Sequence, residues 1–443
     1  MRFFIKNYGC QMNSYDSERM SDLMIAAGHE SVLTPEEANV VVLNTCSIRD
    51  KADEKVFSDL GRLKMIKEKS SGDFFIVVAG CMAQLRSRDI IRRAPYADAV
   101  LGPQNIQRIA EIIDDFVKNK ELDTIVSTSF DVDDKFRKLS DKFSTRGVSE
   151  FLTIQEGCDN FCTYCVVPNT RGREFSRSVA DIVKEAKNLV SLGVKEITLL
   201  GQNVNSYAGE NAEGEKCNLA GLLFELAGVD GLRRLRYVTS NPKDVNKSIA
   251  EAHRDINILM PFLHLPVQSG SDAILRKMNR KYTRSEYVEC VCMLREYCPR
   301  IAFSSDFIVG FPGETDADFD QTLKLAGEIN YAQAYSFKYS PRPGTAAARM
   351  GDQIPENVKS ERLAILQDLL NDQQSQFNQK FIDRRVSVLL VKEGKHENQL
   401  GGRSEYSQAV SVCIDDGEFA VGDIVDVRIT EIASHSLIGI IEK

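Results

Sequence analysis

Short apolar runs alternate with amphipathic stretches in the first 118 residues of the chain. Apolar runs of strand length lie at residues 2–6, 39–43, 74–79 and 97–101. Helical patterns lie at residues 14–27, 50–69, 83–93 and 104–118. Short, almost wholly apolar strands that alternate with helices are typical of a parallel sheet covered on both faces. The pattern therefore predicts a small doubly wound α/β domain over residues 1–118.

A second, longer alternation follows a polar stretch. Residues 119–143 are charged and lack an apolar stripe, and we interpret them as a linker. Strands are then expected at residues 151–155, 196–200, 234–238, 262–267, 301–309 and 334–339. Helices are expected at residues 179–192, 219–227, 245–254, 284–297 and 316–329. Six such units predict a partial (β/α)6 barrel over residues 144–373, with a six-stranded doubly wound sheet as the competing arrangement.

The last part of the chain is rich in strand signals. Apolar, β-branched runs lie at residues 386–391, 409–414, 424–430 and 437–441, with Gly and charged residues between them. This pattern predicts a small antiparallel β-barrel over residues 376–441. Such barrels often bind RNA, but a fold does not decide a function, and this segment is not visibly basic.

Composition narrows the class of protein. A chain of 443 residues exceeds the size at which one core keeps growing, which agrees with two or three domains. The longest apolar runs are far shorter than a membrane span, and the first residues lack signal-peptide features, so we expect a cytoplasmic protein without a membrane partner. In a reducing compartment, 11 cysteines indicate metal or core roles rather than disulfides. The net charge of −8 argues against indiscriminate nucleic-acid binding, although a local basic patch can still bind RNA.

Three cysteines follow the first expected strand of the middle domain with C-x3-C-x2-C spacing, namely Cys158, Cys162 and Cys165. A structural zinc site requires four ligands, and no nearby His or fourth Cys supplies the last one. A cubane iron–sulfur cluster has four irons, so three thiolates leave one iron open to an outside ligand. The spacing favours such a cluster, and a zinc site with a distant fourth ligand is the alternative.

Three further cysteines occupy equivalent positions in the first domain. Cys10, Cys46 and Cys81 each follow one of its first three strands. Loops at the carboxyl ends of parallel strands lie side by side, so these residues can converge on one site. We interpret them as a second three-cysteine cluster with an open iron, and three separately buried thiols are the alternative.

Small and amide residues stand at successive strand ends of the middle domain. These positions are Gly201, Gln202, Asn203, Ser240, Gln268, Ser269, Asp306, Gly310 and Gly313. Such residues allow a backbone to approach a ligand closely and to exchange hydrogen bonds with it. Each stretch alone would fit a simple turn, but together they predict a nucleoside-sized pocket.

Two groups of basic residues are candidates for RNA contact. Arg171 and Arg173 follow the cysteine loop and have the chemistry to contact phosphates or to stack on a base, or else they belong to a solvated or salt-bridged loop. A second run contains Lys277, Arg280, Lys281 and Arg284. Charge runs are usually solvated faces, and we interpret the second run in this way.

Taken together, these motifs resemble the radical S-adenosylmethionine (SAM) methylthiotransferases, and most closely the MiaB type that acts on tRNA. The resemblance extends over essentially the whole chain. It is carried by residues 9–13, 44–49, 158–165 with Pro168, 265–271, 305–314 and 341–345. It implies an N-terminal methylthiotransferase domain, a radical-SAM core and a C-terminal TRAM barrel.

The resemblance also implies two [4Fe–4S] clusters. Cys158, Cys162 and Cys165 would bind the cluster that holds SAM, and Cys10, Cys46 and Cys81 would bind an auxiliary cluster. The strand-end residues given above would line the SAM pocket, with Tyr164 beside the adenine. Arg171, Arg173 and Arg403 would contact RNA.

The implied reaction adds a methylthio group to carbon 2 of N6-(dimethylallyl)adenosine at position 37 of tRNA. That carbon carries an unactivated C–H bond, so a cofactor must perform the hard step, and SAM would serve as radical source and methyl donor. The implied partners are the tRNA anticodon stem-loop, a reductant such as a flavodoxin or ferredoxin, and a sulfur or iron–sulfur donor. We expect a monomer.

Several alternatives remain at this point. Related methylthiotransferases act on a ribosomal-protein aspartate or on other adenosine derivatives of tRNA. A non-catalytic electron-transfer protein with two clusters and an RNA-binding scaffold with structural zinc belong to other classes. Clusters with four cysteines each would favour the electron-transfer protein, whereas this chain offers two groups of three.

Overall fold

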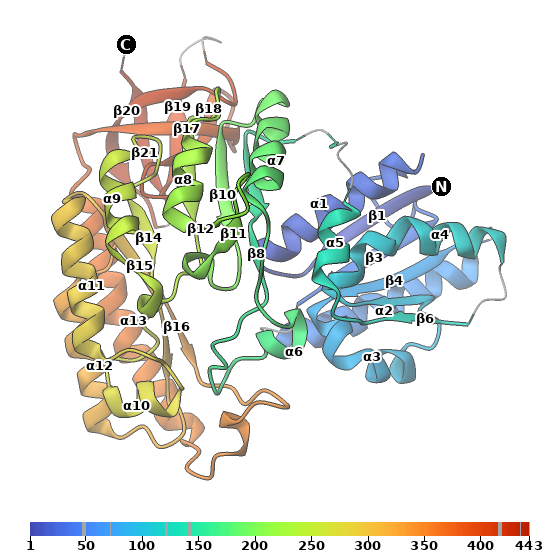
Figure 1. Ribbon diagram of the computed structural model, residues 1–443, viewed down its shortest axis with the longest axis horizontal. Helices are drawn as coiled ribbons and strands as arrows, with labels where there is room; N and C mark the ends of the chain where they lie inside the picture. Colours follow the sequence, from blue (N-terminus) through green and yellow to red (C-terminus); the bar gives the residue numbers. More distant parts are fainter. Residues whose placement is uncertain are drawn as a thin grey trace.

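The computed structural model describes residues 1–46, 50–70, 72–119, 123–139, 143–144, 146–414, 419–434 and 436–442, and for residues 50–52 and 132–134 it describes the backbone alone. Residues 47–49 of the motif at 44–49, and parts of the expected linker, lie outside these ranges. Figure 1 shows an N-terminal domain at the right, a larger central domain, and a C-terminal domain above it. The division into residues 1–118, 119–143, 144–373 and 376–441 stays a prediction.

The N-terminal domain is a parallel sheet with the strand order β2-β1-β3-β4-β5-β6. Its strands are β1 (Arg2–Asn7), β2 (Glu30–Ser31), β3 (Val40–Thr45), β4 (Phe75–Gly80), β5 (Ala99–Leu101) and β6 (Ile125–Ser127). Every residue of β3 and β4 is buried, because helices cover both faces of the sheet. The chain moves outward from β1 in both directions, so the predicted doubly wound fold is confirmed.

Helices on the two faces of this sheet bury separate apolar clusters. The helices are α1 (Gln11–Ala26), α2 (Asp50–Lys69), α3 (Cys81–Arg93), the 3-10 helix η1 (Pro103–Arg108) and α4 (Ile109–Lys118). Met20 of α1 and Ile112 of α4 pack on one face, and Leu60 of α2 and Ile90 of α3 pack on the other. Helix α1 starts directly after Cys10, and it faces both its own sheet and the central domain.

The central domain has six parallel strands in sequential order. They are β7 (Ser149–Thr153), β10 (Glu196–Leu200), β13 (Arg234–Tyr237), β14 (Phe262–His264), β15 (Ala302–Val309) and β16 (Gln333–Lys338). A parallel bridge between Leu235 and Leu259 joins the two three-stranded halves. Right-handed crossovers between sequential strands place all helices on one face. The partial barrel is therefore confirmed, and the competing doubly wound arrangement is wrong.

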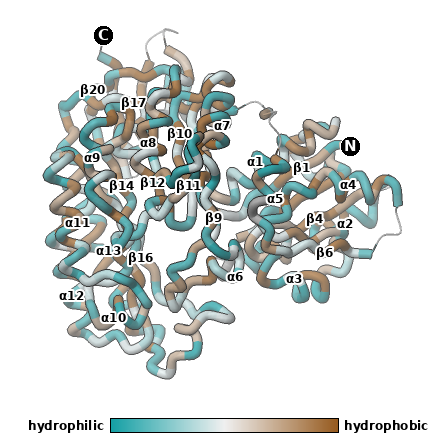
Figure 2. Tube along the Cα trace, viewed as in Figure 1, coloured by the Kyte–Doolittle hydropathy of each residue, from teal (hydrophilic) through white to brown (hydrophobic). Residues whose placement is uncertain are grey.

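The covering helices follow the strands in turn. They are α7 (Val179–Ser191), α8 (Leu219–Ala227), α9 (Lys247–Asp255), α11 (Arg284–Tyr297) and α12 (Asp316–Ile329). A last helix, α13 (Glu356–Gln379), is not among the predicted elements and packs against β16 and α12. Figure 2 shows hydrophobic colour along inner strands such as β4 and long hydrophilic stretches along outer helices such as α12.

Short elements shape the loops of the central domain and are absent from the sequence-based expectation. They are α5 (Val132–Arg137), β8 (Gln155–Glu156), α6 (Val167–Arg171), β9 (Phe175–Ser176), η2 (Val204–Ser206), β11 (Ala208–Glu210), β12 (Lys216–Asn218), η3 (Pro242–Asp244), α10 (Asp272–Lys277) and η4 (Ala347–Arg349). Of these, α5 lies in the expected linker, and β6 of the first sheet also comes from it. The linker thus contributes structure to its neighbours.

The C-terminal domain is a closed barrel with the order β17-β18-β19-β21-β20. Its strands are β17 (Arg385–Glu393), β18 (Gln399–Ser404), β19 (Ala409–Cys413), β20 (Ile424–Ile432) and β21 (Leu437–Ile441). The predicted barrel is confirmed, and its pairings are antiparallel except for the parallel pair β19–β21. Arg234, at the start of β13, donates to the Arg403 carbonyl at 2.8 Å, so this barrel docks at the amino end of the central strands.

Helix α1 joins the first domain to the central barrel. Met12 and Tyr15 form an apolar cluster with Leu200, Phe151 and Val238 of the barrel strands. The Thr153 hydroxyl donates to the Met12 sulfur at 3.7 Å at the end of β7. The start of α1, which carries Cys10, therefore lies beside the carboxyl ends of the barrel strands. In the described part of the chain, no helix has the length and apolar character needed to cross a membrane.

Candidate active site

The loop that carries Cys158, Cys162 and Cys165 lies between β8 and α6 at the carboxyl end of the barrel. Gly157 enters this loop with φ +79°, and a Cβ there would lie 1.9 Å from the Arg173 carbonyl oxygen. A glycine is therefore required for the close turn. The Thr163 amide donates to the Met278 carbonyl at 3.0 Å, and the Ala347 amide donates to the Thr163 carbonyl at 2.9 Å. These bonds fasten the far side of the loop to the barrel.

Arg280 reaches this cysteine loop, contrary to the expectation that its basic run is a solvated face. Its guanidinium lies 3.4 Å from the Cys162 sulfur and donates to the Tyr282 hydroxyl at 2.8 Å. Lys277 and Lys281 of the same run are exposed, as expected. The run is therefore split, because the loop after α10 turns one of its side chains inward.

The end of β10 is tied to the cysteine loop by amide side chains. Gln155 Oε1 accepts hydrogen bonds from the backbone amides of Gln202 at 2.9 Å and Asn203 at 3.2 Å. Gln202 Oε1 in turn accepts from the Gly157 amide at 2.5 Å. A Cβ on Gly201 would lie 2.6 Å from Gln155 Oε1, so a larger residue would displace the oxygen that accepts these hydrogen bonds. The structure thus brings Gly201, Gln202 and Asn203 together beside Cys158.

The next strand ends lie against one another in the same way. The Gln268 amide donates to the Asp306 carbonyl at 2.9 Å, and Gln268 itself has φ +72°. Ser269 is buried beside it. Non-glycine residues in the left-handed region are strained, and such strain concentrates at functional sites. Thr239, at the end of β13, has the same feature with φ +67°.

The turn after β15 approaches the cysteine loop from the other side. Gly310 has φ +69°, and a Cβ there would lie 2.3 Å from Lys359 Cγ. Gly313 has φ +74°, and its carbonyl accepts from Lys277 at 3.3 Å. The Tyr164 ring meets the Phe311 ring edge-on, with 6.4 Å between the centroids. Tyr164 therefore packs between the cysteine loop and this turn.

Two buried polar atoms at these strand ends have no partner among the described residues. They are Oδ1 of Asn203 and Oγ of Ser240, whose residues are 2% and 5% exposed. A buried polar group without a hydrogen bond is costly unless a ligand or water satisfies it. Both atoms belong to the predicted SAM pocket. The residues present therefore fit a polar cofactor such as SAM.

Replacing Ser240 by Ala is expected to weaken SAM binding about two- to tenfold, the usual contribution of one hydrogen bond. The melting temperature of the unliganded protein should not fall, because the hydroxyl has no partner within the described protein. Equilibrium dialysis with labelled SAM and a thermal scan measure the two effects. Ser271→Ala is the matched control, since its hydroxyl caps α10 and its loss should lower stability instead. Unchanged SAM affinity in Ser240→Ala would remove Ser240 from the pocket.

The other three cysteines gather where strands of the first sheet end. Cys10 precedes α1, Cys46 follows β3, and Cys81 begins α3 directly after β4. Gly80, the last residue of β4, has φ +93°, and a Cβ there would lie 2.3 Å from the Thr45 carbonyl oxygen. This glycine lets Cys81 come close to the end of β3. Helix N-termini at Cys10 and Cys81 favour thiolates, which are the form that binds metal.

Electrostatics link these thiols to one another and to Arg171. A hydrogen bond with Cys46 and, to a smaller extent, the charge of Arg171 lower the pKa of the Cys10 thiol to about 6, against the effect of burial. Burial raises the pKa of Cys81, and the charge of Arg171 opposes this rise. At the other site, burial and the neighbouring Cys162 raise the pKa of Cys165 to about 12. In each site, thiols lie close enough to shift the pKa of a neighbouring thiol: Cys46 acts on Cys10, and Cys162 acts on Cys165.

A single metal ion and a cubane cluster place different demands on their thiol ligands. In the ranges that the structure describes, no three His, Cys, Asp or Glu side chains surround one point as ligands of a single ion do. A cubane cluster binds each thiolate at a different iron, so its ligands stand farther apart. Three sulfur donors in each group fit this type of cluster.

Of the three arginines expected to contact RNA, two are exposed and one is not. Arg173 and Arg403 lie on the surface. Arg171 is only 2% exposed and pairs with Asp16 at 2.8 Å and with Glu156. The expectation that Arg171 contacts RNA is therefore wrong for this structure, because its guanidinium is enclosed between the first domain and the barrel.

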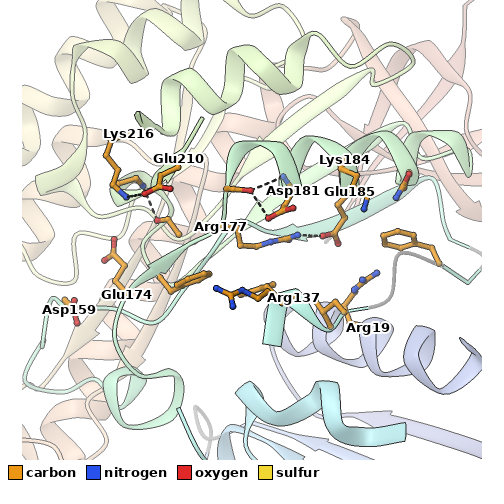
Figure 3. Close-up of a pocket in the computed structure, with 18 residues that line it drawn as sticks. Arg19, Arg137, Asp159, Glu174, Arg177, Asp181, Lys184, Glu185, Glu210 and Lys216 are labelled. Atoms are coloured by element: carbon orange, nitrogen blue, oxygen red, sulfur yellow. Dashed lines mark hydrogen bonds and ion pairs between the residues drawn. The ribbon is translucent and has the colours of Figure 1, made fainter. Parts of the chain in front are cut away.

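A cavity of about 960 Å³ lies outside the barrel, between α7, α5, β9 and the β11–β12 hairpin (Figure 3). Arg177 and Glu185, which form an ion pair at 2.7 Å, line this cavity. The stacked rings of Phe136 and Phe175 line it as well. Neither the six cysteines nor the expected SAM-contacting residues line it. Its lining does include Asp159, which lies between Cys158 and Cys162, so the cavity reaches one edge of the cysteine loop.

Comparisons with known proteins agree with this arrangement. The family model "Uncharacterized protein family UPF0004" matches residues 2–102, "Radical SAM superfamily" matches residues 152–326, and "TRAM domain" matches residues 380–441. Among solved structures, the radical SAM methyltransferase TsrM from Kitasatospora setae aligns with a TM-score of 0.58 at 13% identity. That alignment covers 78% of this chain and 74% of TsrM. The SAM radical enzyme OxsB aligns with a TM-score of 0.54 at 12% identity, over 86% of this chain and 56% of OxsB. At these identities the likeness concerns the fold.

Relatives with much higher identity specify the family. Proteins of Bartonella tribocorum and Bartonella bacilliformis are each 49% identical to this chain over 444 aligned residues. Each alignment covers 99% of this chain and 96% of the relative. Both relatives carry the name tRNA-2-methylthio-N(6)-dimethylallyladenosine synthase. This chain therefore belongs to the tRNA-2-methylthio-N(6)-dimethylallyladenosine synthase family of radical-SAM methylthiotransferases.

Proposed function

We propose that this enzyme adds a methylthio group to carbon 2 of N6-(dimethylallyl)adenosine at position 37 of tRNA. The name of its relatives supports this reaction. The observation that carries the proposal is the pairing of two three-cysteine groups. Each group lies at the carboxyl end of a parallel sheet, and the start of α1 brings one beside the other. A reaction that needs both a radical source and a sulfur donor requires two such sites in proximity.

The two cysteine groups have different roles in this proposal. Cys158, Cys162 and Cys165 hold the cluster to which SAM binds, and Cys10, Cys46 and Cys81 hold the auxiliary cluster. When bound, the two [4Fe–4S] clusters and SAM supply the radical and sulfur chemistry that acid–base side chains lack. The protein's own residues provide placement. Asn203 and Ser240 present unpartnered polar atoms to SAM, and Tyr164 lies beside its adenine.

The tRNA is bound through its anticodon stem-loop. Proteins usually recognise RNA sequence in splayed, single-stranded bases, and a loop base leaves its stack more cheaply than a paired one. Arg173, next to the cysteine loop, and Arg403, on the C-terminal barrel, are the exposed cations that we assign to RNA contact. The enzyme works in the cytoplasm as a monomer. A flavodoxin or ferredoxin reduces it, and a sulfur or iron–sulfur donor restores the auxiliary site.

A comparison of three substrates tests this proposal. The reconstituted enzyme receives SAM, reductant and three substrates in separate reactions: isopentenylated tRNA, the same tRNA without the isopentenyl group, and a ribosomal-protein peptide that contains the target aspartate of the related enzymes. Mass spectrometry should find methylthio product on the isopentenylated tRNA. The unmodified tRNA should react poorly, because it lacks the apolar contact of the isopentenyl group.

The same reactions decide between the alternatives. Product on the peptide with none on either tRNA would assign the enzyme to the ribosomal-protein type. Equal reaction of both tRNAs would show that the isopentenyl group is not recognised, which contradicts the proposed substrate.

A further inference from the structure

Four charged side chains from four elements meet in the buried interface between the first domain and the barrel. Asp16 comes from α1, Lys135 from α5, Glu156 from β8 and Arg171 from α6, and each is at most 2% exposed. Lys135 Nζ lies 2.8 Å from Asp16 and 3.0 Å from Glu156. Arg171 pairs with Asp16 at 2.8 Å and also with Glu156. Two cations thus face two carboxylates, and each cation forms an ion pair with both carboxylates.

This quartet connects the two cysteine sites. Glu156 lies two residues before Cys158, and Asp16 lies on the helix that begins after Cys10. Helix α6, which ends at Arg171, packs against α3, which begins at Cys81. The charge of Arg171 acts on the thiols of Cys81 and Cys10. The Arg171 carbonyl accepts from the Gln104 side chain of η1, so its backbone is held by the first domain as well. A residue of the radical-SAM barrel is therefore built into the neighbouring site.

The chemistry of the quartet suggests what this contact does. A buried charge is costly unless it is paired, and within the quartet the charges balance. When Cys10, Cys46 and Cys81 ionise to bind metal, they add negative charge beside Arg171. A guanidinium has five donors in a planar fork, so Arg171 can keep both carboxylates and still donate toward sulfur. Hydrogen bonds and charge near the sulfurs of a cluster set its reduction potential.

We propose that Arg171 is a positioning residue of the auxiliary site, which it fixes against the barrel and whose thiolate charge it partly neutralises. This role rests on the proposed function of Cys10, Cys46 and Cys81 as ligands of the auxiliary cluster. It replaces the expected contact with RNA. It also explains why an arginine beside the SAM-binding cysteine loop is enclosed rather than exposed.

The test uses the full chain with Cys158, Cys162 and Cys165 replaced by Ala, so that only the auxiliary cluster is formed. Into this parent we introduce Arg171→Gln or Arg171→Lys. Iron content, the EPR spectrum of the reduced cluster and its midpoint potential are measured anaerobically. Arg171→Gln should lower the potential, because the lost cation no longer stabilises the more negative reduced state. A tenfold change in the reduction equilibrium corresponds to about 59 mV for one electron. Arg171→Lys keeps the charge and should shift the potential less.

Arg177→Gln in the same parent is the matched control. Arg177 is a buried arginine of the same interface, where it pairs with Glu185 at 2.7 Å and donates to Tyr15 of α1 at 3.4 Å. Among the described residues, no cysteine hydrogen-bonds to Arg177. Arg177→Gln should therefore lower thermal stability about as much as Arg171→Gln and leave the potential and the spectrum unchanged.

Each outcome bears on the proposal. A potential and spectrum in Arg171→Gln that match the parent would overturn it, as would equal shifts in Arg171→Gln and Arg177→Gln. Loss of iron from Arg171→Gln alone would support it, whereas loss from all variants would point to collapse of the interface and overturn it. If Arg171→Gln fails to fold, the shift in Arg171→Lys decides. A parent that binds no iron would instead refute the auxiliary-cluster assignment itself.

Discussion

Replacing Cys158, Cys162 and Cys165 together by Ala will abolish formation of 5′-deoxyadenosine from SAM. The same change will reduce the iron content from about eight to about four atoms per chain, because only one of two four-iron clusters can still form. The cysteines stand on one short loop that Gly157, Thr163 and the bonds to the barrel hold in place. Loss of their sulfurs removes the metal ligands and leaves that backbone intact. Iron analysis and chromatography of the SAM products measure both effects after anaerobic reconstitution.

The control removes three cysteines elsewhere, Cys217, Cys292 and Cys413, none of which is buried. That variant should keep its iron and its activity. If the loop variant loses no iron, the loop does not hold a cluster. If the loop variant loses all its iron, the first domain does not hold one independently.

Replacing Cys10, Cys46 and Cys81 together by Ala will have the complementary effect. SAM cleavage to 5′-deoxyadenosine should continue in part, because the barrel and its cysteine loop are unchanged. Methylthio-modified tRNA should be absent, since the sulfur-donating site is lost. The two products are quantified by mass spectrometry from the same reaction with isopentenylated tRNA. In this variant, loss of the methylthio product with retention of 5′-deoxyadenosine would separate the functions of the two cysteine groups completely.

A single substitution close to Cys10 controls for damage to the fold. Met12→Leu conserves volume in the apolar contact between α1 and β7 and should leave both products in place. Normal methylthio product from the triple variant of Cys10, Cys46 and Cys81 would refute the sulfur-donor role. Loss of both products would show instead that the first domain is needed for SAM cleavage.

Local patterns in the sequence predict most of the fold. The strands β3 and β4 are buried on both faces, so their residues form continuous apolar runs that stand out from their surroundings. The rule that parallel strands end at one edge then places Cys46 and Cys81 near Cys10 without any coordinates. The positions of the six cysteines after strands could be predicted, because short-range sequence patterns show where each strand ends.

The contacts of the arginines could not be predicted in this way. Arg171 and Arg280 both stand in charged stretches that are typical of solvated surfaces. Arg171 is enclosed because Asp16, 155 positions away in the sequence, pairs with it in the folded chain. Lys135, 36 positions away from Arg171, pairs with the same carboxylate. Helix α13 is similarly missing from the prediction, since its mixed surface packs on β16 and α12 without a clear apolar stripe. Packing between distant segments decides all three cases.

Lys135 restricts the amino-acid sequence of the segment between the first two domains, whereas most linkers are restricted mainly in length. Its ammonium is the second counter-ion for Asp16 and Glu156, at full burial. A spacer of equal length but generic sequence would leave two carboxylates with one cation, an imbalance that the low-dielectric interface penalises strongly. Recombination that exchanged the first domain or this segment alone would disturb the balance between the two cations and the two carboxylates. During evolution, residues from Asp16 to Arg171 are therefore expected to be inherited as one block.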